Sequence, residues 1–80
     1  MLPVQLDMAL AAIGWGTRDL SRSCGVSLDT IARFKRGERL RDTTIATMRA
    51  ALETAGVEFI AENGGGPGVR LRARTGGPPN

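Results

Sequence analysis

Basic side chains are concentrated in residues 33–41, a stretch in which Glu38 is the single acid. Arginine and lysine carry fixed positive charge, and the arginine guanidinium binds planar acceptors such as phosphate, carboxylate or the edge of guanine. Alone, such a run is as typical of a solvated surface as of an anion-binding site. The five basic residues of the stretch are Arg33, Lys35, Arg36, Arg39 and Arg41.

The residue types that catalysis usually needs are scarce. There is no histidine, and Cys24 is the single cysteine, which we expect to fill a small space in the core. The usual zinc sites and the Cys/His or Ser/His catalytic pairs therefore cannot be built within one chain. The glycine-rich residues 64–68 lack the lysine of a phosphate-binding loop and indicate a turn. We expect no enzymatic activity, no metal and no cofactor.

Size and composition predict one small globular domain. The chain has 80 residues, of which 41% are hydrophobic and 24% charged, and its net charge of +3 suits an anionic partner. The N-terminus shows no basic region followed by an apolar run, and no segment is long enough to span a membrane. We therefore expect a cytoplasmic protein without a membrane partner.

Four helices are predicted from apolar residues at helical spacing and from signals at the helix ends. Leu6, Leu10 and Ile13 form one stripe, and Ser27 and Asp42 are placed as N-caps of the third and fourth helices. The expected helices cover residues 3–13, 17–24, 27–36 and 42–55.

After the fourth predicted helix, apolar residues recur at every second position, which predicts a β hairpin. Two alternating runs, residues 57–62 and 69–74, flank a glycine-rich loop. One face would carry Val57, Phe59, Ala61, Val69, Leu71 and Ala73. The other would place Glu58 and Glu62 beside Arg70, Arg72 and Arg74. We expect a helical domain over residues 1–56, the hairpin over 57–74 and a disordered tail over 75–80.

Residues 17–34 meet the steric demands of two helices that cross steeply at a tight turn. Ser21 is small where the helices pack closely, and Gly25 tolerates positive φ in the turn. The apolar residues that would point into the corner are Leu20, Cys24, Val26, Ile31 and Phe34. Residues 13–37 (IGWGTRDLSRSCGVSLDTIARFKRG) resemble the phage-repressor type, lambda-repressor-like (Cro/C1-type) helix-turn-helix DNA-binding family. With the flanking helices the resemblance covers roughly residues 4–55.

The resemblance implies a mostly α fold of four to five helices, here with a C-terminal β hairpin in place of the last helix. It also implies that the second helix crosses the DNA backbone while the third enters the major groove by its N-terminal end. The candidates for base contacts are Ser27, Leu28, Asp29, Thr30 and Arg33. Arg33 is the strongest, because its fork matches guanine O6 and N7, and Leu28 suits a thymine methyl. Asp29 either accepts from cytosine N4 or complements the helix dipole.

Phosphate contacts are expected on both sides of the third helix, from about half of a set of basic and hydroxyl residues. The set comprises Thr17, Arg18, Arg22, Lys35, Arg36, Arg39, Arg41, Thr43 and Thr44. Two departures from the family stand out. Thr17 occupies the place of a phosphate-binding Gln in many members, and Leu10 and Lys35 replace a basic residue and a Glu that form an ion pair in many members. That pair is expected to be lost.

The hairpin has two alternative roles. An isolated hairpin is marginal in water, so Val57, Phe59, Val69 and Leu71 are candidates for the interface of a homodimer. Such a dimer would present two recognition helices about 34 Å apart to a palindromic operator. In the alternative, the hairpin folds back on the fourth helix of a monomer.

These features predict a bacterial or phage transcriptional regulator that binds double-stranded DNA sequence-specifically, in the cytoplasm at the nucleoid. The alternative is a helix-turn-helix interaction module that pairs with a regulatory partner protein or a toxin and does not touch DNA; the basic residues argue against it. RNA binding is a weaker alternative, because one Trp, two Phe and no Tyr give little surface for base stacking.

Overall fold

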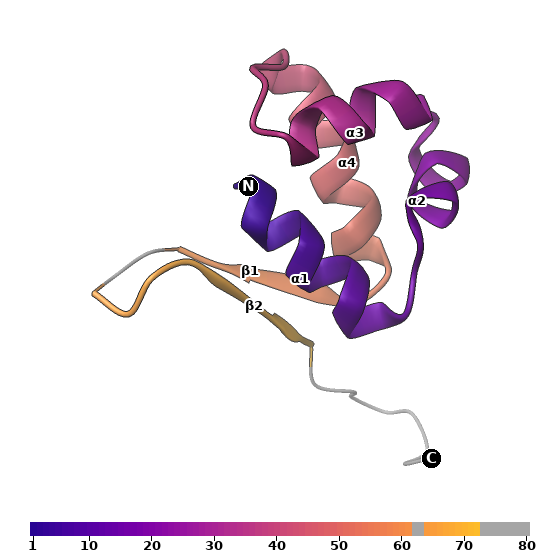
Figure 1. The fold of residues 1–80 in the computed structure, drawn as a ribbon. Helices are drawn as coiled ribbons and strands as arrows, with labels where there is room; N and C mark the ends of the chain where they lie inside the picture. The colour runs from indigo at the N-terminus through magenta and orange to yellow at the C-terminus, as the bar shows by residue number, and fades with distance from the viewer. Residues whose placement is uncertain (62–63, 73–80) are drawn as a thin grey trace, which may run out of the picture.

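The structure, a computed structural model, describes residues 1–61 and 64–72 (Figure 1). Over these residues four helices precede a two-stranded antiparallel sheet, so the predicted mostly helical class with a C-terminal hairpin is confirmed. The elements are α1 (Pro3–Ile13), α2 (Thr17–Cys24), α3 (Leu28–Lys35), α4 (Asp42–Thr54), β1 (Val57–Ile60) and β2 (Gly68–Leu71). The predicted tail over residues 75–80 lies outside the described residues. In the part that is described, no helix has the length and apolarity needed to cross a bilayer.

One hydrophobic core joins all four helices to the hairpin. The deepest residues, each fully or almost fully buried, come from α1, α2, α3, α4 and β1, and are Leu6, Leu20, Ile31, Met48, Leu52 and Val57. The predicted corner residues take their expected places, with Leu20, Ile31 and Phe34 buried and Cys24 and Val26 packed against the core. Because α2 and α3 have only eight residues each, their helical conformation depends on this packing.

The beginning of α4 differs from the prediction by one residue. Arg41, in an extended conformation, is the N-cap, and Asp42 is the first helical residue. The predicted cap at Asp42 is therefore wrong. Asp42 still favours the positive end of the helix dipole from the first turn. The side chain of Arg41 has only donors, so it cannot accept from the first N–H groups of α4.

The hairpin has the predicted alternation over shorter strands. Val57 lies opposite Leu71 and Phe59 opposite Val69, while Glu58 lies opposite Arg70 and pairs with it at 2.7 Å. Arg72 is an exception. It was expected beside the glutamates, but its Nη2 donates to the carbonyl of Glu53 at the end of α4 (2.9 Å). A cation at the C-terminal end of a helix is favoured by the helix dipole. The predicted partners Glu62, Ala73 and Arg74 lie outside the described residues.

The apolar face of the hairpin packs on its own chain, against α1 and α4 (Figure 1). Val57 is buried, Phe59 and Val69 are partly buried against the core, and Leu71 is 54% exposed. The ring of Phe59 also lies under the guanidinium of Arg49 on α4, 5.0 Å away. The side chains proposed for a dimer interface are thus mainly used inside the chain.

The buried amide of Gln5 on α1 fastens the hairpin to the helices. Its Nε2 donates to the carbonyl oxygens of Ile60 (3.2 Å) and Gly68 (3.0 Å), one on each strand. Its Oε1 accepts from the backbone N–H of Leu2 at 2.8 Å. One side chain therefore satisfies two strand carbonyls and the start of α1.

We predict that Gln5→Met lowers the free energy of unfolding by about 1–3 kcal/mol, because methionine keeps the bulk but leaves two partly buried carbonyls without this donor. Urea unfolding measures the change. Val4→Met is the matched control, since it places the same side chain at the neighbouring, exposed position of α1. Equal midpoints for the two variants would show that the amide does not fasten the hairpin.

Candidate nucleic-acid interface

The turn between α2 and α3 is held by two hydrogen bonds that both involve Ser21 of α2, one accepted by its carbonyl and one donated by its hydroxyl. The backbone N–H of Gly25, at φ 78°, donates to the carbonyl of Ser21 (2.8 Å), and Ser21 Oγ donates to the carbonyl of Val26 (2.6 Å). The predicted left-handed Gly25 is confirmed. Ser21 was expected only to be small, and its hydrogen bond adds a second reason for serine. Figure 1 shows α2 nearly end-on and α3 from the side, so their axes cross steeply.

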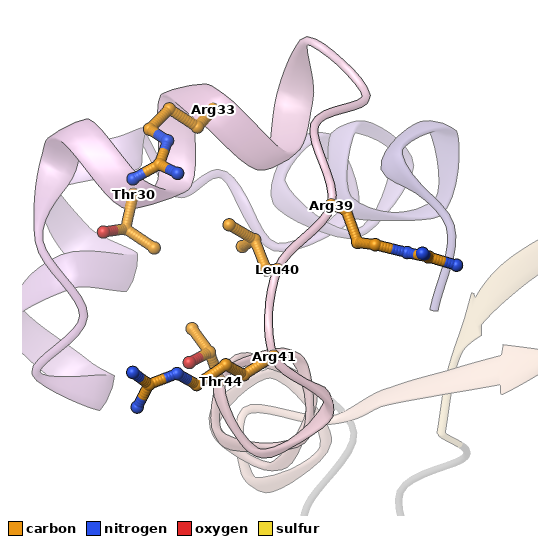
Figure 2. A pocket seen from close by; sticks show the side chains of 6 residues that line it. All are labelled: Thr30, Arg33, Arg39, Leu40, Arg41 and Thr44. Carbon is orange, nitrogen blue, oxygen red and sulfur yellow. The ribbon is translucent and has the colours of Figure 1, made fainter.

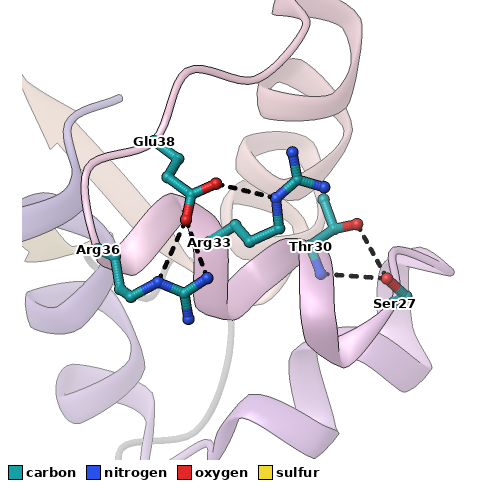
Figure 3. A network of polar contacts seen from close by, with 5 residues as sticks. All are labelled: Ser27, Thr30, Arg33, Arg36 and Glu38. Atoms are coloured by element: carbon teal, nitrogen blue, oxygen red, sulfur yellow. Dashed lines mark hydrogen bonds and ion pairs between the residues drawn. The ribbon is translucent and has the colours of Figure 1, made fainter.

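The N-terminal end of α3 is capped by a pair of hydroxyl residues. Ser27 is the N-cap, as predicted: its Oγ accepts from the backbone N–H of Thr30 (3.1 Å) and donates to Thr30 Oγ1 (2.9 Å) (Figure 3). Asp29 lies in the first turn and is exposed, which places its charge favourably for the helix dipole. Three of the five candidates for base contacts, Ser27, Asp29 and Thr30, therefore also stabilise the helix end that carries them.

A hollow lies beside the turn, between α2 and the first residue of α3. It is lined by Arg18, Ser21 and Arg22 of α2 and by Leu28 of α3, whose side chain is 39% exposed. Two candidates for phosphate contacts thus lie beside a candidate for a base contact. Thr17, the first residue of α2, is half-buried.

A larger hollow of about 460 Å³ lies on the other side, between α3 and the start of α4. Figure 2 shows Thr30 and Arg33 on one rim, Arg41 and Thr44 on the opposite rim, and Leu40 between them. Arg39 also lines the hollow, but its side chain extends away across the connecting segment. Among the residues that the structure describes, those that line this hollow include three arginines and no acid. The hollow is therefore suited to an anion.

Glu38 lies between two of the arginines and was not among the predicted site residues. Its Oε1 accepts from Nε of Arg33 at 3.1 Å, and its Oε2 accepts from Nη2 of Arg36 at 2.9 Å (Figure 3). The hydrogen bonds from Arg36, and then those from Arg33, hold the pKa of Glu38 below its ordinary value of 4.5. The sequence signal for Glu38 is its place as a lone acid directly after Gly37 in a basic stretch.

Lys35 faces α1 as well as solvent. Its Nζ lies 3.6 Å from Oδ1 of Asp7, so this ion pair joins α3 to α1. The family's pair between these helices was expected to be lost, and the structure has a pair of opposite polarity there, one helical turn away from Leu10. Lys35, a candidate for a phosphate contact, thus has an ion-pair partner on α1. Thr43, another candidate, lies at the start of α4 and is exposed.

Compared with known proteins, the chain matches no family model and no curated protein sequence.

The pKa of Glu38 gives a direct test of this cluster. Because the folded-state pKa is lowered, the ion pairs stabilise the folded protein above pH 4.5, and this contribution is lost as the pH falls through the lowered pKa. We predict a titration midpoint below 4.5 when the Glu38 carboxyl is followed by NMR. Arg36→Ala should raise the midpoint more than Arg33→Ala, since Arg36 is the larger cause. Arg70→Ala, on the hairpin, should leave it unchanged; a midpoint insensitive to Arg36→Ala would contradict the assignment.

Proposed function

We propose that this chain is a sequence-specific, double-stranded DNA-binding transcriptional regulator of the phage-repressor type, with α3 as its major-groove recognition helix. The observation that carries the proposal is the arrangement of cations around α3. Basic residues from α2 line a hollow on one side of the helix, and basic residues from the α3–α4 segment line a hollow on the other. Duplex DNA presents a matching pattern, with a phosphate strand on each side of the major groove.

In this arrangement the outward-facing residues of α3, from its N-terminal end to Arg33, read the bases. An α-helix with its side chains is about 10–12 Å across, and the major groove is about 12 Å wide. Leu28 contacts a thymine methyl, and Arg33 donates to guanine O6 and N7. Ser27 and Thr30 keep the helix end intact through their mutual hydrogen bonds, which fixes the direction in which these side chains leave the helix.

The flanking residues bind phosphates and set the register on the duplex. Arg18 and Arg22 contact one strand, and Arg39, Arg41 and Thr44 contact the other. These four arginines are exposed, so little desolvation opposes their binding. The phosphate contacts supply most of the affinity for any sequence and make it depend on salt.

The homodimer on a palindromic operator is part of the same proposal. Because Val57, Phe59 and Val69 pack within their own chain, a partner subunit would pair with the backbone at an outer edge of β1 or β2. Leu71, which is 54% exposed, would add apolar contact area. Over the described residues the sheet has two strands, so both outer edges are without a third strand.

We predict that selection from a random duplex library at about 0.15 M salt, where non-specific binding is weakened, enriches a defined sequence. An inverted repeat would indicate a dimer, and a single half-site a monomer. Arg33→Ala should then lower the preference for one guanine by about 1–3 kcal/mol, roughly 5- to 150-fold. Arg70→Ala removes the same charge from the hairpin and should leave the preference intact. No enrichment by the unaltered protein would exclude sequence-specific binding and favour the protein-interaction module.

Arg41→Ala tests the flanking contacts separately. We expect weaker binding to all duplexes by a similar factor, because phosphates are the same in every sequence. For each subunit bound, the slope of log affinity against log salt concentration should become shallower by about 0.9. Titrations at three or more salt concentrations give the slope, with Arg70→Ala again as the control. A loss confined to one duplex sequence would argue against a phosphate contact.

A further inference from the structure

Glu38 makes unequal contacts with its two arginines. Arg36 donates from both Nε (3.2 Å) and Nη2 (2.9 Å) to the same carboxylate oxygen, so one edge of its guanidinium is occupied. Arg33 donates from Nε alone, at 3.1 Å. Its two terminal amino groups take no part in the contact with Glu38. Figure 2 shows the Arg33 guanidinium directed toward Thr30 at the rim of the larger hollow.

The backbone brings Glu38 to this place independently of the ion pairs. Gly37, at φ 89°, turns the chain back after α3. Its N–H donates to the carbonyl of Phe34 (2.9 Å), and the N–H of Glu38 donates to the carbonyl of Arg33 (3.0 Å). This is the left-handed helix end that glycine favours. Glu38 therefore contacts Arg33 through both its backbone and its carboxylate.

We propose that Glu38 is a specificity-determining positioning residue, which holds Arg33 by Nε so that its two terminal amino groups are presented together to one guanine. The proposal rests on the DNA-binding function proposed above. Guanine O6 and N7 accept in parallel from such a pair of groups. A long side chain that is already held in its binding geometry loses less conformational freedom on binding, and the gain applies only where a guanine is present.

The negative charge of Glu38 has the opposite effect on binding to DNA in general. A carboxylate beside the major groove repels phosphates, so it lowers the affinity for every sequence. Glu38 therefore lowers the affinity for all duplexes and raises the preference for a duplex that carries the guanine. A residue that served only the stability of α3 would not move these two quantities in opposite directions.

The test compares Glu38→Gln with the unaltered protein on two duplexes, the selected sequence and the same sequence with the guanine read by Arg33 replaced. The variant keeps the size of the side chain and removes its charge. We expect affinity for the replaced duplex to rise. The ratio of the two affinities should fall about three- to tenfold, because a mobile arginine fork discriminates less well than a fixed one.

Glu58→Gln is the matched control. It makes the same substitution at a half-buried glutamate that also has an arginine partner, on the hairpin, which α1 separates from α3 (Figure 1). It should leave the ratio unchanged. In the Arg33→Ala background, Glu38→Gln should also leave the ratio unchanged, since its effect passes through Arg33. Urea unfolding verifies that each variant is folded.

The outcomes separate this inference from the proposed function. If the unaltered protein selects a sequence but Glu38→Gln keeps the full ratio, Glu38 does not position Arg33 and the inference is overturned while DNA binding stands. The same holds if Arg33→Ala keeps the ratio. If the unaltered protein selects no sequence, the proposed function fails and the inference fails with it.

Discussion

The shortness of α2 and α3 is the constraint on which the rest of this structure depends. Eight residues are too few for a helix to be stable alone in water, because the cost of the first turn is not recovered over so short a length. Each helix persists because its inward side chains enter the shared core, Leu20 from α2 and Ile31 and Phe34 from α3. The two helices that would meet DNA thus have no independent structure.

This dependence also fixes the direction of α3. With Ile31 and Phe34 buried and Lys35 paired to Asp7 on α1, the helix has little freedom to rotate about its axis. The outward positions, among them Leu28 and Arg33, are then set by the core. A binding surface built on rigid elements holds its side chains more closely than one built on loops. The hairpin contributes at a distance, since it packs on α1 and α4, of which α1 packs against α3 and α4 against α2.

Local signals predicted the helices well, and long-range contacts account for what was missed. Ser27 and Gly25 act within their own turns, so their roles follow from residue type and position alone. The contacts of Gln5 with Ile60 and Gly68 join residues more than fifty positions apart, and no local pattern indicates them. The partner of Lys35 could not be identified without the packing of α1. Glu38 is intermediate between a local and a long-range case. Gly37 indicates in the sequence that the chain turns here, but the contact of Glu38 with Arg33 depends on the geometry of that turn.

The distribution of acids around the arginines fits a division of roles under the proposed function. Within residues 1–61 and 64–72, the arginines proposed to contact phosphates, which are Arg18, Arg22, Arg39 and Arg41, make no ion pair, whereas Glu38 holds Arg33 by its Nε and also pairs with Arg36. Phosphates repeat along the whole duplex, so a mobile cation finds one in many conformations. A base edge offers its acceptors in one place and one direction. An acid that restrains a cation is therefore a disadvantage at the phosphates and an advantage at a base, and Glu38 lies beside Arg33, the arginine proposed to read one.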